Sequence, residues 1–151
     1  MRTFIALVCV LIVAACAARP PLSEAGQQDL IVQYAENGDF IKIFKNSDLF
    51  GGDKLTDDVA LYVSLCCKTP MQTAKLLDDN WFKVTHKKFT EVEQQELMKR
   101  RKVDADEVVI GRRMAKPYAP AIYVHDDYIT GFYYKDGTIV YSYAYVSGVS
   151  L

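Results

Sequence analysis

The sequence predicts an α+β fold, in which an N-terminal helical half packs on a C-terminal antiparallel meander of three or four strands. In the stretches 29–48 and 58–81 the apolar residues fit helical spacing, whereas from residue 107 they alternate with a period of two, as in half-buried strands. Asp136-Gly137, between two alternating segments, is a strong signal for a two-residue hairpin turn. Half of the 151 residues are hydrophobic and a quarter are charged, which is ordinary for a globular protein.

The first residues have the pattern of a secretory signal peptide, because Arg2 precedes an apolar run that is followed by small residues. This run is too short to span a membrane comfortably. We therefore expect a leader over residues 1–18, a small, polar and Pro-containing tether over 19–28, and a single α+β domain over 29–151. Loss of Arg2 leaves 17 basic against 19 acidic residues, and this net charge of −2 excludes an electrostatic case for nucleic-acid binding.

Two positions for leader cleavage remain open. Val13-Ala14-Ala15-Cys16 resembles the lipobox of bacterial lipoproteins, which implies cleavage before Cys16, lipid on its sulfur and stable membrane anchoring by several acyl chains. Cleavage after Ala17 or Ala18 would instead release a freely secreted protein. Small secreted animal domains usually carry several disulfides, but the body of this chain has only the adjacent Cys66 and Cys67. The missing disulfide framework favours lipidation at Cys16.

The first elements of the domain are open to two interpretations. Asn37-Gly38 could be the turn of a β-hairpin over residues 29–48, or the break between two helices. We favour helices, because a similar helix–turn–helix pattern recurs over residues 58–81, with its turn at 68–70. The stretches "YAENGDFIKIF" and "CCKTPMQTAKLLDDNW" resemble the helix pairs of ankyrin repeats, which implies stacked helical hairpins.

The remaining elements follow from caps and alternation. Residues 49–55 are expected to form a loop, with Thr56 or Asp57 as the cap of the next helix. A short strand is predicted over 81–89, and a capping box of Thr90 with Glu93 opens a helix that ends at Lys99-Arg100-Arg101-Lys102. The alternating segments that predict strands are 107–114, 121–125, 128–135 and 138–146.

Tyrosines dominate the C-terminal half, since eight of the ten lie between residues 118 and 145. A two-residue turn at Asp136-Gly137 predicts a register in which Phe132 faces Tyr141, and Gly131 faces Ser142 on a small-residue face where a helix could lie. The other face is the candidate binding surface for a protein or glycan, and its large residues are Tyr128, Phe132, Tyr134, Tyr141, Tyr143 and Tyr145. The alternative is a covered core face of cross-strand aromatic pairs.

Three further groups have a structural and a chemical interpretation. Cys66-Cys67 is expected to be two small buried helix residues, with a vicinal or intermolecular disulfide as alternatives. His125-Asp126-Asp127 is expected to form a hairpin turn, or else the acid–base cluster of a small hydrolase. The basic residues 99–102 with Arg112-Arg113 are expected to be solvated, or to contact an anionic partner. No pattern of a metal site, cofactor site, nucleophile elbow or phosphate loop is present.

The sequence therefore favours a non-catalytic protein of the cell envelope that binds or inhibits a partner, for instance of the immunity type. It would be exported and held by Cys16 at a periplasmic or plasma-membrane face. One alternative is a freely secreted eukaryotic effector or fluid protein with a tyrosine-rich sheet. A second alternative is a small hydrolase that uses His125, Asp126 and Asp127.

Overall fold

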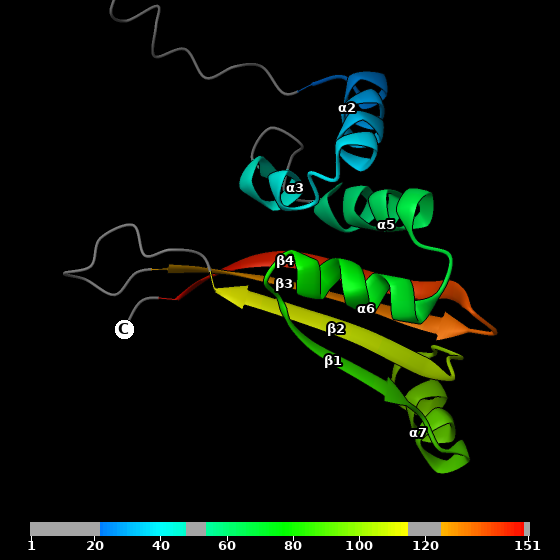
Figure 1. Cartoon of the computed structure of the whole chain (residues 1–151). Coiled ribbons are helices and arrows are strands. Elements are labelled where there is room, and N and C mark those ends of the chain that lie inside the picture. The colour runs from blue at the N-terminus through cyan, green and yellow to red at the C-terminus, as the bar shows by residue number, and fades with distance from the viewer. Residues whose placement is uncertain (1–21, 48–53, 115–124, 150–151) are drawn as a thin grey trace, which may run out of the picture.

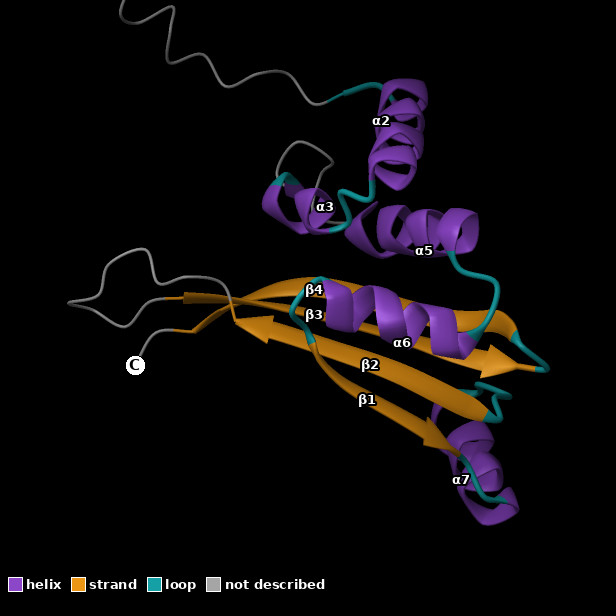
Figure 2. Ribbon diagram, viewed as in Figure 1, coloured by secondary structure: helices purple, strands orange, loops and turns teal. Residues whose placement is uncertain are grey.

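The computed structural model describes residues 22–47, 54–114 and 125–149, without the side chains of His125 and Val149, and it confirms the α+β class. Its helices are α2 (Glu24–Asn37), α3 (Ile41–Lys45), α5 (Leu55–Cys66), α6 (Pro70–Asp79) and α7 (Glu91–Arg101). Its strands are β1 (Lys83–Lys88), β2 (Glu107–Met114), β3 (His125–Lys135) and β4 (Thr138–Val149). The described strands form one antiparallel sheet in the order β1-β2-β3-β4 (Figures 1 and 2).

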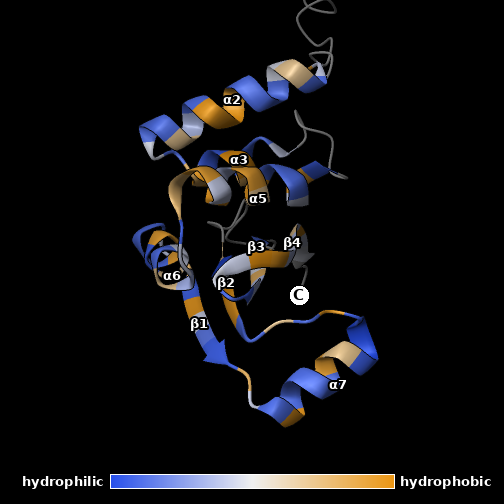
Figure 3. Ribbon diagram, turned by 90° about the vertical axis from the view of Figure 1, so that its right-hand side faces the viewer, coloured by the Kyte–Doolittle hydropathy of each residue, from blue (hydrophilic) through white to orange (hydrophobic). Residues whose placement is uncertain are grey.

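The elements are arranged in layers. Helix α6 lies over β1 and β2, α5 lies over β4, and α2 rests on α5 away from the sheet (Figure 1). Helix α7 lies on the other side of the sheet, near one end (Figure 3). We call the side covered by α5 and α6 the helix face, and the opposite side the far face.

The predicted helix pair over residues 29–48 is confirmed, and its break has a local cause. Gly38 follows α2 in the left-handed conformation, with φ of 71°, and its backbone N–H donates to Ala35. Glycine takes this conformation without a side-chain clash, so Asn37-Gly38 ends a helix instead of turning a hairpin. The tether predicted over 19–28 is wrong from Glu24 onward, because Ser23 accepts a hydrogen bond from Gly26 N–H and caps α2.

The predicted start of α5 is also wrong. Lys54 occupies the N-cap position and makes no side-chain capping bond, so neither Thr56 nor Asp57 caps the helix. The Thr56 hydroxyl instead donates to the carbonyl of Ala144 at 3.2 Å and accepts from its N–H at 3.0 Å. Thr56 thus forms hydrogen bonds with the backbone N–H and C=O of Ala144 at the outer edge of β4. A capping rule considers only neighbouring residues and does not anticipate a partner so far along the chain.

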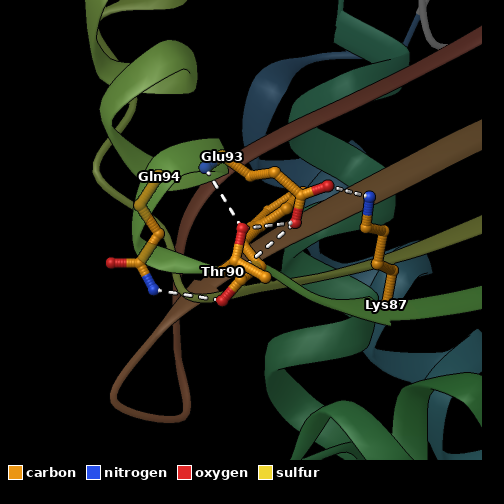
Figure 4. Close-up of polar contacts among 5 residues, drawn as sticks. Lys87, Thr90, Glu93 and Gln94 are labelled. Atoms are coloured by element: carbon orange, nitrogen blue, oxygen red, sulfur yellow. Dashed lines mark hydrogen bonds and ion pairs between the residues drawn. The ribbon is translucent and has the colours of Figure 1, made fainter.

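The strand at 81–89 and the capping box are confirmed. Thr90 and Glu93 exchange side-chain and backbone hydrogen bonds at the start of α7, and Lys87 donates to Glu93 at 2.5 Å (Figure 4). Helix α7 has no buried residue of its own. Its position therefore depends on this cap and on partly buried contacts such as that of Leu97.

The predicted turn at His125-Asp126-Asp127 is wrong. These residues are the start of β3 and pair with Val149, Gly148 and Ser147 of β4. Their preference for turns is a local tendency, which the long β3–β4 ladder overrides. The segment expected as a separate strand at 121–125 lies outside the described residues except for His125, which belongs to β3.

The main core lies between the helix face and the helices. Phe40 is its centre, because its ring lies 5.1 Å from that of Tyr62, 5.6 Å from that of Phe44 and 5.9 Å from that of Phe82. All four rings are at most 3% exposed. A smaller apolar cluster on the far face joins the sheet to α7, and its buried members are Val103, Ala105, Val108 and Tyr133.

Candidate functional site

The six residues predicted to share one surface lie on both faces of the sheet. The turn at Asp136-Gly137 forms as predicted, with positive φ at both residues, and Tyr134 pairs with Ile139. A bulge then places two residues of β4, Val140 and Tyr141, where one was expected, and Tyr141 pairs with Tyr133. Because side chains alternate along a strand, one extra residue sends the rest of β4 to the opposite face.

The β3 half of the predicted surface is therefore core. Tyr128, Phe132 and Tyr134 point to the helix face and are 7%, 0% and 2% exposed. Tyr134 donates or accepts a 2.7 Å hydrogen bond with the hydroxyl of Thr73 on α6, and burial raises the pKa of Tyr134 to about 12. These three residues are wrongly placed in the predicted binding surface.

The β4 half forms a tyrosine ladder on the far face. Tyr141 and Tyr145 are 42% and 48% exposed, and Tyr143 between them is partly buried. The ring of Tyr143 lies 6.4 Å from that of Tyr141 and 6.1 Å from that of Tyr145, the second pair being stacked. Tyr133 extends the ladder onto β3, with its ring 5.5 Å from that of Tyr141.

The register adds neighbours to this ladder. Ile129 pairs with Tyr145 on one side and Arg112 on the other, so both lie on the far face. Met114, two residues along β2 from Arg112, lies on the same side and is 64% exposed. We call the following set the tyrosine face: Tyr133, Tyr141, Tyr143, Tyr145, Ile129, Arg112 and Met114.

Gly131 explains how Tyr143 is held. The two residues are cross-strand partners, and a Cβ at Gly131 would lie 2.5 Å from the Tyr143 ring. The ring therefore lies directly over the glycine backbone, and burial raises the pKa of its hydroxyl. The predicted pairing of Gly131 with Ser142 is wrong, because Gly131 pairs with Tyr143 and Ser142 lies on the helix face.

A buried carboxylate orients the basic member of the tyrosine face. Arg112 Nε donates to Asp127 Oδ2 at 2.8 Å, and a second bond runs from Arg112 Nη2 to the same oxygen. The Asp127 side chain is 2% exposed and that of Arg112 is 63% exposed. The pair thus fixes a guanidinium at the surface while its carboxylate lies inside.

The adjacent cysteines are both free thiols at the end of α5. Cys66 is exposed and Cys67 is partly buried, so the prediction of two buried residues is wrong. Their sulfur atoms lie 2.9 Å apart. The peptide leaves the helix at Cys67, which removes this residue from the helical packing that the prediction assumed.

The basic residues of the sequence prediction lie at the end of α7 and on β2. Arg100 pairs with Glu96, and Lys102 adopts a left-handed conformation at the end of α7. Arg113 donates to the carbonyl of Asn80.

Cys16 and the leader lie outside the described residues. Within the described ranges, no group of three or more His, Cys, Asp or Glu side chains could hold a metal ion, and no helix is long and apolar enough to cross a membrane.

The sequence reasoning missed Tyr133, Ile129, Arg112 and Met114 as members of the exposed surface. Alternation along β2 and β3 does separate these residues from Phe132 and Tyr134, and this was the available signal. No sequence pattern indicates the position of the bulge in β4, because the residues before and after it all favour strands.

Comparison of the chain with protein-family models, curated proteins and solved structures finds no match to any of them.

Proposed function

We propose that this is a non-catalytic binding protein, exported to the cell envelope or secreted, which contacts a protein partner through the tyrosine face. The observation that carries the proposal is the exposure of Tyr141, Tyr145 and Met114 on the side of the sheet opposite α5 and α6. Large exposed apolar groups of a monomer often mark an interaction site.

The composition of this face favours a protein over a glycan as the partner. Tyrosine, methionine and arginine are enriched at protein–protein interfaces, and lysine and acidic residues are depleted. Arg112 stands at the face with its planar guanidinium oriented by buried Asp127. Such a pre-oriented arginine loses little further freedom on binding and suits a carboxylate of the partner.

The placement of Asp127 also favours binding over hydrolysis. A buried carboxylate that accepts two bonds from Arg112 is poorly placed to contact a substrate. The ion pair with Arg112 is enough to explain why a carboxylate is buried at position 127. Loss of Arg112 would leave the charge of Asp127 buried without its partner, which is strongly destabilising.

A double variant tests the binding surface. Tyr141→Ser with Tyr145→Ser removes the two most exposed rings of the ladder without touching the main core. The matched control is Trp81→Ser, because Trp81 is 82% exposed at the turn between α6 and β1 and is not part of the tyrosine ladder on β4. Native-envelope or secretion extracts are cross-linked with each protein, and cross-linked peptides are identified by mass spectrometry.

We expect cross-links that map to β4 in the wild type and the Trp81 variant, and at least a tenfold loss in the tyrosine variant with unchanged thermal unfolding. A tenfold loss corresponds to about 1.4 kcal/mol, so each of the two tyrosines would need to contribute only about 0.7 kcal/mol to binding. Equal cross-linking of both variants would contradict the proposal. Binding to immobilised polysaccharide without any protein cross-link would identify a glycan partner instead.

We further propose that the leader is cleaved before Cys16 and that this cysteine carries lipid, on the strength of Val13-Ala14-Ala15-Cys16. The intact mass of the mature protein tests this directly. A chain that begins at Cys16 and carries acyl groups is the expected result, and Cys16→Ser should move the protein from the membrane to the soluble fraction. A mature chain that begins at Ala18 or Arg19 without acyl groups would show free secretion.

A further inference from the structure

A second site lies at the junction of α5 and α6, independent of the tyrosine face. Cys66 ends α5 and Cys67 follows it with φ of −128° and ψ of 119°. In a continuing helix, consecutive side chains diverge by about 100° around the axis. The extended backbone at Cys67 removes this divergence, and the two sulfurs meet at 2.9 Å.

The surroundings of the pair distinguish its two sulfurs. The two thiols lie within hydrogen-bonding distance of each other, and the Thr73 hydroxyl stabilises the thiolate form of Cys67. Thr73 in turn bonds to the buried hydroxyl of Tyr134, which fixes the threonine rotamer from the sheet side. Lys68 adds a positive charge next to the pair. Cys67 is therefore held by partners that favour its thiolate.

The ionisation of the pair follows from these contacts. The hydrogen bond from Cys66 lowers the pKa of Cys67, and the same bond raises the pKa of Cys66, with burial adding to that rise. Cys67 is thus the thiol that ionises first, and Cys66 keeps its proton. This is the order expected when Cys67 is the nucleophilic cysteine and Cys66 the resolving cysteine. Cys66 is the exposed member of the pair.

We propose that Cys66 and Cys67 form a reversible redox site, which exchanges with low-molecular-weight disulfides and closes to a vicinal disulfide. The Cys67 thiolate attacks one sulfur of the small disulfide, forming a mixed disulfide and releasing one thiolate. Cys66 then loses its proton and attacks the Cys67 sulfur, which forms the Cys66–Cys67 bond and expels the second thiolate. Two electrons pass from the protein to the small disulfide, whose two thiolates take up the proton of Cys66 and one proton from the solvent.

The site is suited to reversible chemistry and not to permanent cross-linking. A disulfide between neighbouring residues closes a small ring that strains the intervening peptide, and strained disulfides are more easily reduced. The exposed position of Cys66 leaves the product open to attack by a reducing thiol. Closure also removes the thiolate that accepts the bond from Thr73, so oxidation alters the contact between α6 and Tyr134.

Equilibration with glutathione tests the proposal. The full chain, with Cys9 and Cys16 changed to Ser so that Cys66 and Cys67 are its only thiols, is incubated at stepped ratios of reduced to oxidised glutathione. Free thiols are then alkylated and the intact mass is measured. We expect one species that has lost two hydrogens and takes up no alkyl group, which reduced glutathione converts back to the dithiol.

Two variants assign the roles of the sulfurs. With Cys66→Ser the serine hydroxyl still donates to Cys67, and a stable glutathione adduct on residue 67 should accumulate. With Cys67→Ser the remaining thiol should react at least tenfold more slowly with oxidised glutathione at neutral pH. Alkylation of both thiols at every glutathione ratio, a stable adduct of the Cys66–Cys67 chain, or a disulfide-linked dimer as the product would each overturn the proposal.

Discussion

At the scale of single residues, two glycines of the sheet show how the same residue type serves two surfaces. A Cβ at Gly111 would lie 3.0 Å and 3.1 Å from side-chain atoms of Leu77, on α6, and of Phe82, which are both buried. A Cβ at Gly131 would instead meet the ring of Tyr143, which is partly exposed and can rotate away. Gly111 therefore sets the distance between α6 and the sheet, whereas Gly131 seats one ring of the tyrosine face.

This difference predicts unequal effects of substitution by alanine. Gly111→Ala should lower the free energy of unfolding by about 1–3 kcal/mol, because α6 must move to relieve the overpacking. Gly131→Ala should be near neutral, since the gain of about 0.5–1 kcal/mol from replacing glycine in a strand offsets a lost aromatic contact. Chemical denaturation measures both variants, and a Gly111→Ala protein as stable as the wild type would contradict the close packing of α6.

At the scale of elements, α7 and the edge of β4 depend on polar contacts more than on burial. Helix α7 has no buried residue, and its start is held by Thr90, Glu93 and Lys87 (Figure 4). The outer edge of β4 is met by Thr56 from α5. The opposite edge strand, β1, is short and carries three lysines, which discourages pairing with another chain.

The cap of α7 predicts a pH-dependent stability. The hydrogen bond from Lys87, followed by that from the Thr90 N–H, lowers the pKa of Glu93 to about 2 from 4.5. A carboxylate with a depressed folded-state pKa stabilises the fold above its unfolded pKa and loses this effect as the pH falls through the folded pKa. The advantage of the wild type over Glu93→Gln should therefore be full above pH 4.5 and should disappear as the pH falls towards about 2.

Unfolding free energies of both proteins between pH 2 and pH 7 measure this effect. The control is Glu91→Gln, which changes the charge of the same first turn outside the network around Thr90. A constant difference between wild type and Glu93→Gln across the whole range would show that the carboxylate does not act through its ionised form.

The edge contact predicts a loss of stability with a change in association. Thr56→Val leaves the N–H and C=O of Ala144 without the hydroxyl that serves both, which should cost about 1–3 kcal/mol. The exposed strand edge should also promote self-association at high concentration. Denaturation and light scattering measure the two effects, and Thr56→Ser, which keeps the hydroxyl, should behave as the wild type. Equal behaviour of the valine and serine variants would exclude a role for the hydroxyl.

At the scale of the whole molecule, the sheet separates two apolar clusters of unequal weight. The cluster on the helix face joins α3, α5, α6 and the sheet around Phe40, whereas the far-face cluster joins only α7 and its neighbours around Tyr133. The second cluster also ends against Tyr143, so α7 and the tyrosine face share one apolar surface. Opening of α7 is thus possible without loss of the main core.

Two truncations should separate these clusters. Phe40→Ala removes a fully buried ring and should cost about 3–5 kcal/mol, a large part of the stability of a small domain. Leu97→Ala should leave global stability within about 1 kcal/mol, because Leu97 is only partly buried. Hydrogen exchange should then accelerate throughout the domain in the first variant, and only in α7 and residues next to it in the second. Acceleration across β2 and β3 in the Leu97 variant would show a single cooperative unit.

Local features of the sequence were enough to predict the fold class, the helix pair at 29–48, the strand at 81–89, the capping box and the turn at Asp136-Gly137. Each depends on residues within one or two turns of chain, where side-chain chemistry and backbone conformation are directly coupled. The path of His125-Asp126-Asp127 and the role of Thr56 depend on partners far along the chain, so local preference predicted them wrongly.

The sequence by itself determined that this protein has helices before an antiparallel sheet, and that the sheet is rich in tyrosine. Only the tertiary structure decided which tyrosines are core and which are exposed. The physical reason is the period of two along a strand, since one bulged residue after Ile139 moves Tyr141, Tyr143 and Tyr145 to the face opposite Tyr128 and Tyr134. The position of that bulge depends on the packing of both faces at once, and this packing exists only in the folded molecule.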